Sequence, residues 1–183
     1  MKGIKRNLPN VLTLINLSLG VIAILLSVSE NNTLNRLFIA SLIVMLAALT
    51  DRFDGKVARM LDVTSELGKE LDSLSDLISF GVAPIIIAWK ISFVTFGVPG
   101  YLLSLIFPIA GAYRLARYNV TTFDNVFRGM PITLAGAFLS IDSLYNLFAI
   151  FNHKYTNIHS IITAVLVVVL SYLMVSKIKI KKV

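Results

Sequence analysis

Apolar residues dominate this chain in long runs that are interrupted at intervals by short polar stretches. A helix that crosses a bilayer needs about 20 mostly apolar residues, and six runs approach that length. They cover Val11–Val28, Leu34–Leu49, Leu74–Phe93, Val98–Ala112, Ile132–Phe151 and Ile158–Val175. We therefore predict an all-α integral membrane protein with six transmembrane helices.

The composition agrees with this class, since 56% of the 183 residues are apolar and only 15% are charged. No linker separates the runs, so we expect one membrane domain over residues 1–183. The first run continues at spanning length instead of ending at a small-residue cleavage site, which favours a first span over a cleaved signal. The chain has no cysteine, which excludes disulfides, thiolate metal ligands and cysteine nucleophiles.

Basic residues predict how the helices are oriented. If both termini lie in the cytoplasm, that side holds all of the 17 Lys and Arg residues except Arg36, Lys90 and Lys154, as the positive-inside rule requires. An even number of spans also places both termini on one side. We expect the net charge of +7 to face anionic lipid head groups rather than nucleic acid.

Four aspartates lie in two helically spaced pairs between the second and third runs. Asp51 and Asp54 are three residues apart, and Asp72 and Asp76 are four apart, so each pair shares one face of a helix. We expect the second span to continue as a helix beyond Leu49 and the third to open near Asp72, so that the four carboxylates meet at the cytoplasmic surface. Such a cluster can hold two Mg²⁺ or Mn²⁺ ions about 4 Å apart, because ligand sets made only of oxygen favour hard cations over zinc.

The residues between the two pairs suit a phosphate-bearing ligand. Gly55, Ala58 and Gly68 have small side chains, which let the backbone approach a flat ring or a phosphate. Arg59 lies one turn beyond Gly55 and can pair with a phosphate oxygen. The alternative is that charges at a membrane surface form only solvated ion pairs and helix caps. That alternative suits the remaining acids of the stretch, Asp62, Glu66 and Glu70.

The acidic stretch resembles the signature of a known family. It reads D-R-F-D-G-K-V-A-R, then eight residues, then G-K-E-L-D-S-L-S-D, and it fits the pattern DxxDGxxAR(x)8GxxxDxxxD of the CDP-alcohol phosphatidyltransferases without a mismatch. The resemblance implies six membrane helices with the signature on the second and third. It also implies a homodimer.

The resemblance further implies a direct displacement in which an alcohol attacks the β-phosphate of a CDP-linked lipid and CMP leaves. It assigns Asp51, Asp54 and Asp72 to one metal ion. Asp51, Asp72 and Asp76 would bind the second ion, and Asp76 would also take the proton of the incoming hydroxyl. The positions it implies for CDP-diacylglycerol binding are Asn10, Thr13, Asp51, Asp54, Gly55, Ala58, Arg59, Ser65 and Gly68.

The second half of the chain resembles the branch of the family that uses serine. The segments RLARYN and FRGMPI carry this resemblance, as does the tail SYLMVSKIKI. Thr133, where a second proline is expected, and Tyr118, where phenylalanine is usual, depart from it. The branch implies transfer of the phosphatidyl group of CDP-diacylglycerol to L-serine at the inner face of the cell membrane.

Four polar residues in this region suit the carboxylate and ammonium groups of serine, because guanidinium forks bind carboxylates well. They are Arg114, Arg117, Asn119 and Arg128. Cytoplasmic loops carry arginine in membrane proteins generally, so each of these arginines also has an explanation as an orientation signal.

Two other functions fit parts of the pattern. The acceptor can be glycerol 3-phosphate or an inositol phosphate, which would require more positive charge around residues 114–128. A divalent-cation channel or transporter can use a carboxylate ring, but it predicts acids spread through the membrane depth. We expect His153 and His159 on the face opposite the aspartates, and we assign no partner to Asp142 in the fifth span.

Overall fold

The computed structural model describes residues 2–30, 33–61, 65–120, 127–177 and 179–180, with the side chains of 2–9, 53–61, 127–128 and 179–180 excepted. The α-helices are α1 (Lys2–Val28), α2 (Thr33–Leu61), α3 (Glu66–Asp76), α4 (Ala83–Ala88), α5 (Val98–Val120), α6 (Ile132–Phe151) and α7 (Asn157–Val175). Two π-helices, η1 (Leu77–Val82) and η2 (Trp89–Phe93), and a 3₁₀ turn, η3 (Val94–Phe96), extend the line of α3 and α4. The short strands β1 (Phe127–Arg128) and β2 (Lys179–Ile180) pair antiparallel.

Six helical segments are long and apolar enough to cross a membrane, which confirms the predicted number. They are Asn10–Val28, Thr33–Arg52, Glu66–Phe96, Val98–Val120, Ile132–Phe151 and Asn157–Val175. The second helix continues past Leu49 to Leu61, as expected. The third begins earlier than expected, because Ser65 caps a polar first turn, so Asp72 lies within a helix instead of at its opening.

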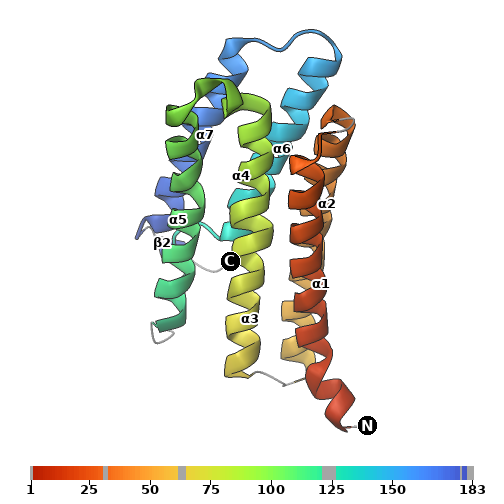
Figure 1. Cartoon of the computed structure of the whole chain (residues 1–183). Helices are drawn as coiled ribbons and strands as arrows, with labels where there is room; N and C mark the ends of the chain where they lie inside the picture. The colour runs from red at the N-terminus through yellow and green to blue at the C-terminus, as the bar shows by residue number, and fades with distance from the viewer. Residues whose placement is uncertain (1, 31–32, 62–64, 121–126, 178, 181–183) are drawn as a thin grey trace.

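The third span lies at the centre of the bundle (Figure 1). Helices α1 and α2 flank it on one side, and α5 and α7 flank it on the other. In its most apolar window, 56% of the residues are buried inside the protein, against 22–44% for the other five spans. The third span is therefore the most buried of the six, and packing against helices on both sides fixes the positions of its residues.

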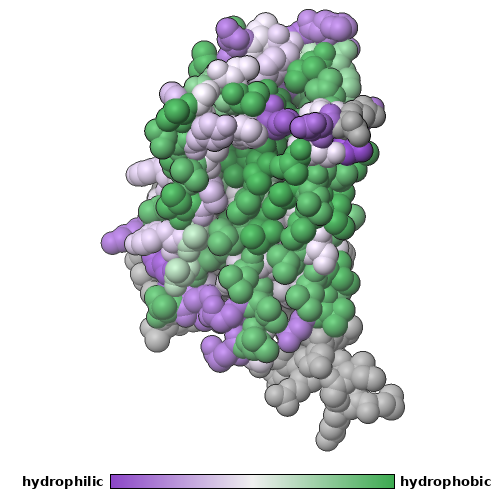
Figure 2. Space-filling view, in the orientation of Figure 1, coloured by the Kyte–Doolittle hydropathy of each residue, from purple (hydrophilic) through white to green (hydrophobic). Residues whose placement is uncertain are grey.

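The outer surface of the helices is largely apolar. Figure 2 shows hydrophobic side chains over the middle of the visible face and hydrophilic side chains gathered toward its two ends. Large exposed apolar residues occur on the outer faces of the spans, with Leu25, Leu105, Phe148 and Val165 among them. Exposed apolar surface of this extent suits contact with lipid, so the chain is a multi-pass membrane protein.

Small residues bring neighbouring helices close to the third span. A Cβ atom added to Gly20 of α1 would lie 2.4 Å from Ser79 Oγ, and one added to Gly136 of α6 would lie 2.6 Å from Phe80 O. Membrane helices pack closely through such small residues. Both contacts fall on η1, where Pro84 cannot donate the α-helical hydrogen bond to Phe80 O because proline has no N–H.

Candidate active site

Three of the four signature aspartates converge at one end of the bundle. Asp51 lies on α2, and Asp72 and Asp76 lie one turn apart on α3. One carboxylate oxygen from each of the three lies within 4.8 Å of the other two, and all three side chains are partly buried. Carboxylates this close repel one another unless a positive charge lies between them.

The donor set of this cluster fits a divalent cation. It consists of carboxylate oxygens, which are the ligands that Mg²⁺ and Mn²⁺ prefer. The same three residues, Asp51, Asp72 and Asp76, form the set that the sequence resemblance assigns to the second ion. The cluster can therefore hold at least one hard divalent cation.

The remaining signature residues of α2 follow Asp51 along the helix. The backbone is helical to Leu61, which places positions 54, 55 and 58 on the same side as Asp51. The side chains of Asp54, Gly55, Ala58 and Arg59 lie outside the part of the chain that the structure describes. Their assignment to the metal and to CDP-diacylglycerol stays a prediction from the sequence.

Predicted ligands of CDP-diacylglycerol on α1 and α3 lie at the junction of these two helices. Ser65 Oγ accepts a hydrogen bond of 3.0 Å from the Gly68 N–H and so caps α3. A Cβ on Gly68 would lie 3.0 Å from Asn10 Oδ1, so a larger residue there would require the Asn10 side chain to shift. Thr13 is buried, and its carbonyl accepts a 3.1 Å hydrogen bond from Ser75 Oγ.

These contacts place the start of α1 beside the line of Gly68, Asp72 and Asp76. The three residues are spaced four apart on α3, so they form one stripe along the helix. Asn10 meets that stripe at Gly68, at the end farther from the apolar interior. The structure thus brings Asn10 beside Gly68 and Thr13 beside Ser75, which precedes Asp76.

Arg114 is the predicted acceptor residue that faces the carboxylates. Its side chain is partly buried near the end of α5 and interacts electrostatically with Asp76 and Tyr118. Its Nε atom is buried and has no hydrogen-bond partner among the described residues. A guanidinium nitrogen in this situation is suited to bind an anionic group that enters the site.

The other predicted acceptor residues contact neighbouring helices. Arg117 Nη1 and Nη2 donate to Val175 O and Ser176 O at the end of α7, at 2.9 and 3.3 Å. Asn119 Nδ2 donates to Ser73 Oγ at 3.0 Å and to Glu70 Oε1 at 3.2 Å. The Asn119 carbonyl accepts from Lys69 Nζ at 3.0 Å. The Arg128 side chain lies outside the described residues.

Thr133 contacts the carboxylate cluster, although the sequence marks it only as a departure from the family pattern. In the structure, Thr133 Oγ1 donates a 3.3 Å hydrogen bond to Asp51 Oδ2. No local motif signals this contact, because 82 residues separate the partners and only the packing of α6 beside α2 brings them together.

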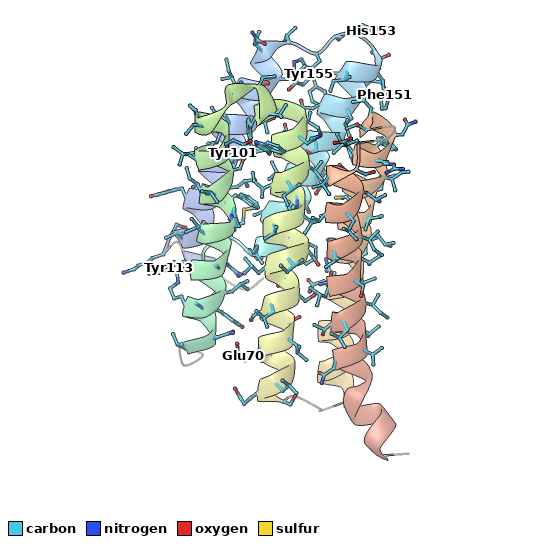
Figure 3. The ribbon with its side chains drawn as sticks, in the orientation of Figure 1. Glu70, Tyr101, Tyr113, Phe151, His153 and Tyr155 are labelled. Carbon is cyan, nitrogen blue, oxygen red and sulfur yellow. The ribbon has the colours of Figure 1, made fainter. Side chains whose placement is uncertain are left out.

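The two histidines lie away from the aspartate cluster. Figure 3 places His153 at the end of the molecule opposite Glu70 of α3. His159 stacks on Tyr145 and Tyr155, with ring centroids 5.8 and 5.1 Å apart. These two histidines therefore do not belong to the metal cluster, as the sequence predicted.

Asp142, which had no partner from sequence, is bonded across α6 and α7. Its Oδ2 accepts from Thr163 Oγ1 at 2.7 Å and from Asn146 Nδ2 at 3.1 Å. A carboxylate inside a span is costly unless it is paired in this way. These contacts fix α6 against α7 within the bundle.

Comparison with known proteins identifies the family. Residues 6–175 match the family model described as CDP-alcohol phosphatidyltransferase. The chain is 36% identical to the CDP-diacylglycerol–serine O-phosphatidyltransferase of Bacillus subtilis (strain 168) over 174 residues, which cover 94% of this chain and 88% of that protein.

Two further relatives match over a shorter part of their length. The chain is 38% identical to the protein of the same name from Helicobacter pylori (strain ATCC 700392 / 26695), over 69% of this chain and 53% of that one. It is 39% identical to the archaetidylserine synthase of Methanothermobacter thermautotrophicus, over 75% of this chain and 57% of that one. The chain thus spans little more than half of these two relatives. The resemblance inferred from the aspartate signature is confirmed, and the chain belongs to the CDP-alcohol phosphatidyltransferase family.

Proposed function

We propose that this protein transfers the phosphatidyl group of CDP-diacylglycerol to the hydroxyl of L-serine, giving phosphatidylserine and CMP. The observation that carries the proposal is the convergence of Asp51, Asp72 and Asp76 beside the partly buried Arg114. The names of the relatives from Bacillus subtilis and Helicobacter pylori support serine as the acceptor.

The carboxylates have two tasks in this reaction. Asp51, Asp54, Asp72 and Asp76 would hold two Mg²⁺ or Mn²⁺ ions, which supply positive charge to the diphosphate and stabilise the oxygen of the leaving CMP. Asp76 accepts the proton of the serine hydroxyl, because an alcohol is a weak nucleophile until that proton is removed. The new bond joins the serine Oγ to the β-phosphorus, and the bond from that phosphorus to the oxygen of CMP breaks.

Arg114 binds the carboxylate of serine in this proposal. It lies beside Asp76, so a serine held by its carboxylate would present its hydroxyl near the proposed base. Asn119 and Arg128 are kept as proposed contacts of serine, whereas Arg117 bonds to the end of α7. Asn10, Thr13, Gly55, Ala58, Arg59, Ser65 and Gly68 remain the proposed residues for the CDP-diacylglycerol head group.

The orientation proposed for the protein follows from its charges and its number of spans. Six spans put both termini on one side, and the bias of Lys and Arg makes that side the cytoplasm. The active site then lies at the cytoplasmic face of the cell membrane. The family resemblance implies a homodimer, which cross-linking in native membranes would test.

The experiment that tests the proposal is CMP release by the purified protein in detergent with CDP-diacylglycerol and Mn²⁺ or Mg²⁺. Serine, glycerol 3-phosphate, inositol and inositol 3-phosphate are compared as acceptors. Stimulation by serine alone supports the proposal. Stimulation by another acceptor would keep the aspartate mechanism and overturn the serine site, and no CMP with any acceptor would favour a transport function instead.

A further inference from the structure

Arg117 binds the end of the last helix. Its two terminal nitrogens donate to the carbonyls of Val175 and Ser176, and its guanidinium carbon lies 5.8 Å from the centroid of the Tyr113 ring. The last carbonyls of a helix have no partner within the helix, and a cation near them is favourable. Arg117 therefore fastens the end of α7 to α5.

Gly129 and Met130, which lie just before α6, contact the same helix end. The Met130 N–H donates a 3.0 Å hydrogen bond to Leu173 O. Gly129 has a φ of 75°, and an added Cβ there would lie 2.6 Å from Met174 O and 2.9 Å from Ser176 O. The carbonyl of Ser176 thus contacts both Gly129 and Arg117.

Ile132 and Thr133, which follow Gly129 and Met130 closely in the chain, link this contact to the proposed active site. Ile132 is fully buried, and its Cδ1 atom occupies the space beside Gly81 and Gly111. Thr133 then donates its hydrogen bond to Asp51. A displacement of the end of α7 would therefore be passed through Gly129 and Ile132 to the segment that contacts the carboxylates.

Beyond the family signature, we propose that Arg117 is a positioning residue for acceptor binding, and this rests on the proposed function. By holding the four carbonyls from Leu173 to Ser176 in place, Arg117 fixes the Gly129–Thr133 segment beside the active site. This segment meets the proposed CDP-diacylglycerol site at Asp51, whereas the other described residues of that site, Asn10, Thr13, Ser65 and Gly68, lie on α1 and around the start of α3. Loss of Arg117 should therefore weaken the acceptor and leave the lipid nucleotide nearly unaffected.

The test measures the kinetics of CMP release for Arg117→Gln with serine and CDP-diacylglycerol varied separately. A charge-assisted pair of hydrogen bonds is removed, so we expect the KM for serine to rise roughly tenfold. The KM for CDP-diacylglycerol should stay within about twofold, since uniform damage to the fold would raise both. Lys177→Gln is the matched control, because it removes an exposed positive charge from the same helix end and should change neither KM.

A second variant separates positioning from direct contact with serine. Gly129→Ala disturbs the same carbonyls without changing the charge, so it should also raise the KM for serine. If both residues act through the end of α7, the double variant should be little worse than the more severe single one. A double variant whose two effects multiply, or an unchanged KM for serine in Arg117→Gln, would overturn the proposal.

Two further results have their own interpretation, namely failure of Gly129→Ala to fold and activity with an acceptor other than serine. If Gly129→Ala does not fold, Arg117→Lys replaces it, because lysine keeps the charge but lacks the guanidinium fork that donates to both carbonyls, and it should raise the KM for serine by a smaller factor than Arg117→Gln. If the unchanged protein releases CMP only with another acceptor, the proposed function fails. The KM for that acceptor then tests the role of Arg117 independently.

Discussion

Replacing Gly136 by alanine should separate α6 from the third span. Gly136 faces η1, at the carbonyl of Phe80 that Pro84 leaves without its α-helical hydrogen bond. The added Cβ would lie 2.6 Å from Phe80 O, 2.8 Å from Phe80 Cβ and 2.9 Å from Phe80 Cα. The atoms in contact belong to the backbone or lie next to it, so they cannot rotate away.

The structure gives the size of the effect. Contacts between carbon and carbonyl oxygen at helix interfaces are about 3.3–3.6 Å, so the helices must move apart by roughly 0.7 Å or more. Overpacking of this kind costs about 1–3 kcal/mol. At about 2–4 °C per kcal/mol for a chain of this size, the Tm should fall by about 2–12 °C.

The assay is thermal unfolding of the purified protein in detergent, with Gly81→Ala as the matched control. A Cβ on Gly81 would meet the ends of two side chains, Leu77 Cδ1 at 3.1 Å and Ile132 Cδ1 at 3.3 Å, and would lie at an ordinary contact distance of 3.9 Å from Pro108 Cα. Its Tm should therefore fall less than that of Gly136→Ala. If the two variants have equal Tm values, the close approach of α6 to Phe80 does not limit packing and the reasoning is wrong.

Other expected results concern the site and the α6–α7 contact. Asp76→Asn should lower the rate of CMP release roughly 100-fold or more while CDP-diacylglycerol binding changes little, whereas Asp51→Asn should lose both; near-normal turnover of Asp76→Asn would refute its role as base. Thr133→Val should reduce CMP release several-fold through the lost bond to Asp51, on the order of 1 kcal/mol, and an unchanged rate would make that bond unimportant. Asp142→Leu removes two hydrogen bonds, but Thr163 can still donate to the His159 carbonyl and Asn146 to Thr163, so the free energy of unfolding should fall by about 1 kcal/mol in a denaturation experiment while the KM for serine holds. Chelation with EDTA should abolish CMP release, and added Mn²⁺ or Mg²⁺ should restore it.

The six spans could be predicted from the sequence because lipid imposes a simple rule on each segment. A helix must be long and apolar whatever surrounds it, so composition alone located all six. The ends were less predictable where a helix continues into water. Helix α3 begins with a polar first turn, and hydropathy cannot detect such a turn.

The convergence of Asp51, Asp72 and Asp76 was predictable because helical spacing places the two aspartates of each predicted pair on one face. The contacts that complete the site were not, because they join residues far apart in the chain. Thr133 reaches Asp51 across 82 residues, and Arg117 reaches Val175 across 58. A basic residue near the acceptor site suggests a ligand contact, and only the packing of α5 on α7 shows that Arg117 bonds to a helix end.

Short contacts to backbone atoms on both sides of the third span hold the carboxylates of α3 in place. On one side, Ser75 and Ser79 donate to the carbonyls of Thr13 and Asn16 of α1. On the other, Gly136 packs against Phe80, one turn beyond Asp76. Such contacts leave little rotamer freedom, because backbone atoms and short side chains have few alternative positions. The carboxylate cluster is therefore built into the packing of the bundle, whereas the proposed acceptor site depends on the Gly129–Thr133 segment. The carboxylate cluster and the proposed acceptor site meet at Thr133. Substitutions in the Gly129–Thr133 segment can therefore change acceptor binding while Asp72 and Asp76 keep their positions.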